Sequence, residues 1–111
     1  MATSNKNLSS FSQKNISDIS ERRFGIVVSE WNPEVTEALY SGTMETLMSH
    51  GASKENIIRK YVPGSYELTL GAQRMAEKEQ IDAVICLGCV IQGETPHFDY
   101  ICQAVANGLT T

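Results

Sequence analysis

Several features that would assign this 111-residue chain to a large protein class are missing from it. No apolar run approaches the ~20 residues that a membrane-spanning helix needs, and the longest, Ala83 to Leu87, has the length of a strand. Lysine and arginine total 9 against 13 aspartates and glutamates, so the net charge of −4 offers no dense basic face for nucleic acid. Neither a Walker A loop nor a G-x-G-x-x-G motif occurs, which excludes the common nucleotide-phosphate cradles. We therefore expect a globular domain without a membrane or nucleic-acid partner.

Cysteine is also scarce, and its three positions, Cys86, Cys89 and Cys102, form an odd set. Without a secretory leader, reduced thiols and a cytoplasmic location are expected. Cys86 and Cys89 have the C-x-x-C spacing, but a zinc site needs two further ligands. Redox pairs expose their first cysteine at a helix start, whereas Cys86 falls within an apolar strand. We expect no metal site, and thiol-redox chemistry is kept only as a third functional hypothesis.

The first 22 residues are polar and serine-rich, with few large apolar side chains, which is typical of a flexible arm. A transit peptide is the alternative interpretation, and Asp18, Glu21 and the low arginine content disfavour it. We expect an arm over residues 1–22 and one α/β domain over residues 23–111.

Apolar, β-branched runs predict strands at residues 24–29, 57–62 and 81–87. The sequence predicts helices in three places: from Asn32-Pro33 to His50-Gly51, over residues 66–78, and from Thr95-Pro96 onward. This alternation is typical of βαβ units on a parallel sheet, and right-handed crossovers place helices on both faces. We therefore expect a doubly wound, flavodoxin-like, three-layer α/β/α fold.

Three finer expectations concern the packing of these elements. Asn32 is expected to cap the first helix, with Pro33 at its first position. The strand at 81–87 is the most hydrophobic and is expected to be central. The apolar side chains at helical spacing predict the buried face of the first helix, and they are Val35, Ala38, Leu39, Gly42, Leu47 and Met48.

Ligands of open parallel sheets bind beyond the carboxyl ends of the strands, where three short segments, 29–32, 62–67 and 88–97, carry unusual residues. Trp31, the only tryptophan, follows the first strand and either packs as an apolar residue or offers a stacking surface to a flat heterocycle. Ser65, Tyr66 and Glu67 follow the second strand. The Glu67 carboxylate either complements the helix dipole or binds a polyol or amine ligand.

The segment Gly88 to His97 is the strongest candidate for a reactive centre. Gly88 and Gly93 let the backbone approach a ligand, and the helix start at Thr95 offers N–H donors to an anion. The positive helix end disfavours a charged imidazole, whereas a bound phosphate favours it. His97 could therefore exchange a proton as the ligand comes and goes, although a lone histidine is often structural.

These three segments also carry a resemblance to a known family. FGIVVSEWN, VPGSYEL and LGCVIQGETPHFDY closely resemble the 6,7-dimethyl-8-ribityllumazine synthase family, over Phe24 to about Gly108. The resemblance implies a transferase of riboflavin biosynthesis. Such an enzyme condenses 5-amino-6-(D-ribitylamino)uracil with 3,4-dihydroxy-2-butanone 4-phosphate, releases phosphate and water, and uses no metal or organic cofactor.

The same resemblance implies roles for individual residues. For the pyrimidine substrate, Trp31 is implied to stack on the ring. The pocket for the ribityl chain is implied to be lined by Ser65, Tyr66 and Glu67. Backbone contacts to the uracil are implied for Cys89, Val90 and Ile91. Glu94 and Thr95 are implied at the phosphate of the butanone, and His97 as the proton-transfer residue. Because Glu94 is acidic, it is expected to point away from the phosphate, to act through water or to weaken binding.

Two expectations come from differences between this chain and the family. The family continues beyond the position of Thr111 with a further central strand and helices, which supply an arginine to the phosphate and an aromatic residue to a neighbouring subunit's site. The domain is therefore expected to be incomplete at its C-terminus. Homo-oligomers are implied, as pentamers or as icosahedral shells. The alternative function is a non-catalytic relative that binds flavin or lumazine or forms a shell.

Overall fold

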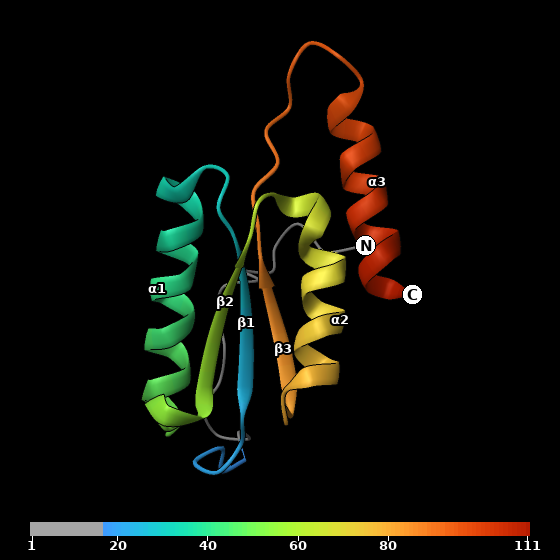
Figure 1. The fold of residues 1–111 in the computed structure, drawn as a ribbon. Coiled ribbons are helices and arrows are strands. Elements are labelled where there is room, and N and C mark those ends of the chain that lie inside the picture. The colour runs from blue at the N-terminus through green and yellow to red at the C-terminus, as the bar shows by residue number, and fades with distance from the viewer. Residues whose placement is uncertain (1–16) are drawn as a thin grey trace.

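A three-stranded parallel sheet forms the centre of the molecule. The computed structural model describes residues 17–111. It contains the strands β1 (Phe24–Ser29), β2 (Ile57–Val62) and β3 (Ala83–Leu87) in the order β2-β1-β3. Phe24 is in register with Ile57 on one side and with Ala83 on the other. All three carboxyl ends therefore lie at one edge of the sheet, as the sequence predicts for parallel strands (Figure 1).

Helices cover both faces of this sheet, which confirms the doubly wound α/β fold. Helix α1 (Pro33–Ser49) links β1 to β2, and α2 (Leu68–Lys78) links β2 to β3. They lie on opposite sides of the sheet, and α3 (His97–Thr110) stands beside α2 (Figure 1). Two short 3-10 helices, η2 (Lys54–Asn56) and η3 (Ser65–Glu67), precede β2 and α2. Among residues 17–111 no helix is both long and apolar enough to cross a membrane.

The central strand is β1 and not β3, so the expectation for residues 81–87 is wrong within the described part of the chain. From Gly25 to Ser29 every residue of β1 is buried, whereas Ala83 is exposed and the rest of β3 is half-buried. The apolar content of a strand reflects its total burial, by the helices that cover it and by the adjacent strands. It does not report which strand has a neighbour on each side.

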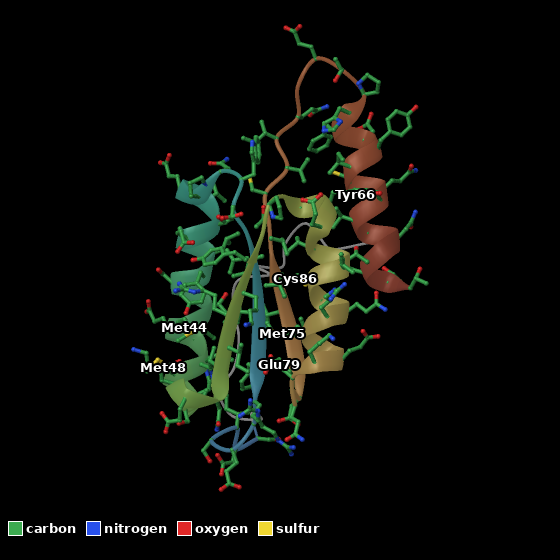
Figure 2. All side chains as sticks on the ribbon, in the orientation of Figure 1. Met44, Met48, Tyr66, Met75, Glu79 and Cys86 are labelled. Atoms are coloured by element: carbon green, nitrogen blue, oxygen red, sulfur yellow. The ribbon has the colours of Figure 1, made fainter. Side chains whose placement is uncertain are left out.

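The core between the sheet and α2 depends on close contact. Val27, Leu68 and Met75 are buried together there. A Cβ atom built on Gly71 of α2 would lie 2.8 Å from Cγ1 of both Val27 and Val62, so this helix approaches the sheet where it has no side chain. Figure 2 shows Met75 on α2 against the strands. This packing fixes where α2 begins, directly beside the carboxyl ends of the strands.

The predicted buried face of α1 is wrong. Val35, Leu39 and Met48 are 39%, 42% and 47% exposed, and Figure 2 shows Met48 at the outer side of the helix. The residue that α1 buries fully is Thr36, whose hydroxyl donates a hydrogen bond to the Asn32 carbonyl at 3.4 Å. Apolar residues occur around most of this helix, so their spacing does not select one face.

The turn that leads into α1 also differs from the expectation. Pro33 is the first helical residue, as predicted, but the Asn32 side chain makes no capping hydrogen bond. Asn32 has a φ of 58°, in the left-handed region that asparagine tolerates better than most residues. Its side chain turns instead toward Cys89, where Nδ2 lies 3.5 Å from Sγ. This contact joins the ends of β1 and β3.

Candidate active site

A cavity of about 630 Å³ opens at the carboxyl ends of the strands. Its size is suited to a small organic ligand. It is lined by segments that follow each of the three strands and by the start of α3, namely Trp31, Gly64, Ser65, Tyr66, Glu67, Cys89, Val90, Ile91, His97 and Ile101. Backbone hydrogen bonds join the segment after β1 to the segment after β2, and the Ser65 side chain joins the segment after β2 to the one after β3.

Eight of the ten residues predicted for the site line this cavity. The other two, Glu94 and Thr95, are exposed in the loop before α3 and do not line it. Two lining residues were missed by the sequence reasoning. Ile101 lies four positions after His97, a spacing that shares one helix face, and Gly64 belongs to the turn that precedes Ser65. Both signals were present in the sequence.

Trp31 is held at the mouth of the cavity by its backbone. The N–H groups of Glu30 and Trp31 donate to the carbonyls of Val62 and Pro63, at 2.7 and 3.0 Å, and so extend the pairing of β1 with β2. The Trp31 side chain is 52% exposed. A side chain that packs as part of the core would be covered, so the exposure favours the stacking interpretation over the packing one.

Ser65 connects the segments that follow β2 and β3. Its Oγ donates to the Cys89 carbonyl at 3.2 Å and accepts the Cys89 N–H at 3.1 Å. Ser65 is 8% exposed. Neighbouring Tyr66 is 61% exposed, and α3 packs against the short helix that carries it.

The Glu67 carboxylate closes the turn between β2 and α2. Its Oε1 accepts the backbone N–H of Gly64 at 2.7 Å, which is the reciprocal contact of a capping box. The local role of this carboxylate, offered as one interpretation of the sequence, is therefore present. Glu67 also lines the cavity.

His97 is the first residue of α3 and is exposed toward the cavity. Its backbone N–H donates to Oγ1 of Thr95 at 3.4 Å, a local contact at the helix start. The first N–H groups of a helix have no acceptor within it, and the helix dipole is positive at this end. An anion beside Thr95 would therefore lie close to His97.

The three cysteines are free thiols, and burial raises the pKa of the Cys86 thiol. A raised pKa is the opposite of what a reactive thiolate needs, as the position of Cys86 in a strand had suggested. All three cysteines line a second cavity of about 330 Å³. Among residues 17–111, no group of three or more His, Cys, Asp or Glu side chains, these cysteines included, is placed so that it could hold a metal ion.

Comparison with known proteins gives consistent results. The family model for 6,7-dimethyl-8-ribityllumazine synthase matches residues 21–111. Curated relatives of that name from Cytophaga hutchinsonii and Parabacteroides distasonis are 61% and 54% identical over 110 residues, which is 99% of this chain and 69% of each relative. A relative of the same name from Flavobacterium psychrophilum is 52% identical over 109 residues, 98% of this chain and 58% of its own length. Every residue that lines the cavity falls within the matched range.

Proposed function

Because this chain belongs to the 6,7-dimethyl-8-ribityllumazine synthase family, we propose that it forms 6,7-dimethyl-8-ribityllumazine in the penultimate step of riboflavin biosynthesis. The substrates are 5-amino-6-(D-ribitylamino)uracil and 3,4-dihydroxy-2-butanone 4-phosphate, and phosphate and water are released. One observation carries the proposal: a single cavity collects an aromatic residue, a carboxylate residue, the stretch Cys89 to Ile91 and a histidine from four separate segments.

The pyrimidine substrate occupies the part of the cavity between Trp31 and the Cys89–Ile91 segment. Half of the Trp31 surface is available for stacking on the ring. Val90 and Ile91 line the same cavity, and in this proposal their backbone groups supply hydrogen bonds to the uracil edge. Tyr66 and Glu67 line the cavity beside this space, and in this proposal they contact the ribityl chain, whose hydroxyls donate to the Glu67 carboxylate.

The butanone phosphate binds at the start of α3. The N–H groups of the first turn and the Thr95 hydroxyl are the donors for the phosphate, and Glu94 points away from it. His97 then lies between the phosphate and the pyrimidine amine. It acts as general acid and base for imine formation, loss of phosphate and ring closure, which require proton transfer and orientation more than a strong nucleophile.

Homo-oligomers, as pentamers or larger shells, are part of this proposal, and so is a cytoplasmic location. The apolar side chains that α1 leaves exposed, including Val35 and Leu39, support association with further protein surface. The free thiols of the three cysteines support a reducing compartment.

Replacement of His97 tests the proposal. In a turnover assay with both substrates, His97→Ala should lower kcat by about 10²–10⁴-fold, the range that a general acid–base residue contributes. The other histidine, His50, lies at the end of α1 and outside the cavity, so His50→Ala is the matched control and should keep turnover per folded molecule. Unchanged turnover in His97→Ala would contradict the role of His97. Tight riboflavin binding by the unaltered chain with no product would favour the non-catalytic alternative.

A further inference from the structure

The Cys89 backbone is held by a neighbour that follows a different strand. Ser65 donates to its carbonyl at 3.2 Å and accepts its N–H at 3.1 Å, although the two residues are 24 positions apart in the chain. A serine hydroxyl has one proton to donate, and Cys89 receives it. Since Ser65 is also 8% exposed, its hydroxyl has no further proton to offer to a ligand in the cavity.

The approach of Ser65 to this backbone depends on Gly88. A Cβ atom on Gly88 would lie 2.6 Å from Oγ of Ser65 and 2.8 Å from Cδ1 of Leu68. Real Cβ atoms do not come so close, so any side chain at position 88 displaces the serine. The position of the Ser65 hydroxyl therefore requires glycine at position 88.

A second contact reaches Cys89 through its side chain. Asn32 does not cap α1, and its Nδ2 lies 3.5 Å from the Cys89 sulfur. Asn32 adjoins Trp31, and Ser65 adjoins Tyr66. The segments that carry these two aromatic residues are therefore both hydrogen-bonded to Cys89. Cys89 in turn begins the Cys89–Ile91 segment that borders the cavity.

We propose that Ser65 and Asn32 are positioning residues, which hold the Cys89–Ile91 backbone at a fixed distance from Trp31 and Tyr66 for the pyrimidine substrate. This inference rests on the proposed function, and it assigns to the Ser65 hydroxyl a role in place of direct substrate contact. Loss of the Ser65 or the Asn32 hydrogen bond to Cys89 lets the Cys89–Ile91 segment move. The affinity for the pyrimidine falls, whereas binding of the butanone phosphate at the start of α3 is unaffected.

The test is Ser65→Ala, with KM measured for each substrate separately. Loss of the two hydrogen bonds should raise KM for the pyrimidine about tenfold, or about 1.4 kcal/mol, and leave KM for the butanone phosphate within about twofold. Ser29→Ala is the matched control, because Ser29 is fully buried and its hydroxyl has no hydrogen-bond partner among the described residues. It should leave both KM values unchanged. Equal changes in the two KM values of Ser65→Ala, or none, would overturn the inference.

Asn32→Gly is the second variant and protects the test against misfolding of the first. Glycine accepts the φ of 58°, so only the amide is lost. We expect about a threefold rise in the pyrimidine KM, since a hydrogen bond to a thiol is weak. An unchanged pyrimidine KM in this folded variant would remove Asn32 from the proposal.

Riboflavin binding separates failure of this inference from failure of the proposed function. Trp31 is the only tryptophan and lines the cavity, so quenching of its fluorescence reports ligand binding without turnover. If the unaltered chain binds riboflavin but forms no product, the proposed function fails. The inference then stands if Ser65→Ala weakens riboflavin binding about tenfold while Ser29→Ala does not, and it falls otherwise. If the unaltered chain neither turns over nor binds, both are wrong.

Discussion

Glu67 and Gly64, which both line the cavity, are joined by a hydrogen bond of 2.7 Å from the glycine N–H to the carboxylate Oε1. The bond closes the turn that carries Ser65 and Tyr66. One carboxylate therefore holds a turn of the scaffold and belongs to a residue that lines the cavity. The two roles that the sequence leaves open for Glu67 are compatible.

Two substitutions of Glu67 should separate these roles. Glu67→Gln keeps an oxygen for the Gly64 N–H but loses the charge, so stability should change little while riboflavin binding weakens. Glu67→Ala loses both, and the free energy of unfolding should fall by about 1 kcal/mol, as for other lost helix caps. Urea denaturation and Trp31 fluorescence measure the two effects. Equal stability of Glu67→Ala and the unaltered chain would mean that the turn does not need this bond.

Gly71 and Gly42 provide a matched pair for the packing of helices on the sheet. In Gly71→Ala, the new Cβ meets Val27 and Val62 at 2.8 Å, and a net loss of about 1–2 kcal/mol is expected after the gain in helix propensity. Gly42 lies within α1, and apart from its chain neighbours and the backbone of its own helix no atom lies within 4 Å of a built Cβ. Gly42→Ala should therefore gain about 0.5–1 kcal/mol. Urea denaturation of the two variants compares them directly, and losses of similar size in both would contradict the close approach of α2.

Cys86 should react slowly and in a pH-dependent way. Burial raises the pKa of its thiol, so at a given pH the folded chain holds less thiolate than the unfolded chain. In a variant with Cys89→Ser and Cys102→Ser, iodoacetamide should alkylate Cys86 more slowly in the folded than in the urea-denatured chain. The rate should rise with pH as the thiolate forms.

The same shift has a consequence for stability. Because the folded chain favours the protonated thiol, this group's contribution is fully present below the pKa of the unfolded thiol. It is lost as the pH rises through the higher folded value. Alkylation of the folded chain at the denatured rate near neutral pH would instead support the thiol-redox hypothesis.

Element positions were predictable where the chain carries local signals. Pro33 begins α1, and Gly51, with a φ of 98°, follows its end, as their residue types suggest. The strands β1 and β2 occupy the predicted residues. Parallel pairing then brings the three strand ends together, which is why most of the candidate site followed from the motifs.

Contacts between distant segments were not predictable from these local patterns. Asn32 has the residue type of a helix cap, yet its side chain reaches Cys89, which is 57 positions away. The two hydrogen bonds between Ser65 and Cys89, which are 24 positions apart, depend in the same way on how α2 packs over the sheet. The outward face of α1 is a third case, because its apolar residues are not confined to one side and Thr36 is the residue buried.

The register of β1 with both of its neighbours sets the order in which the cavity can form during folding. Phe24 pairs with Ile57 and with Ala83, so the second pairing closes a much longer loop of chain than the first. A chain synthesised only as far as α2 contains Trp31 and Tyr66 but neither Cys89 nor His97. The cavity therefore cannot be complete until β3 has paired with β1 and the start of α3 is in place, so a ligand that needs all of its lining cannot guide the earlier pairing of β1 with β2.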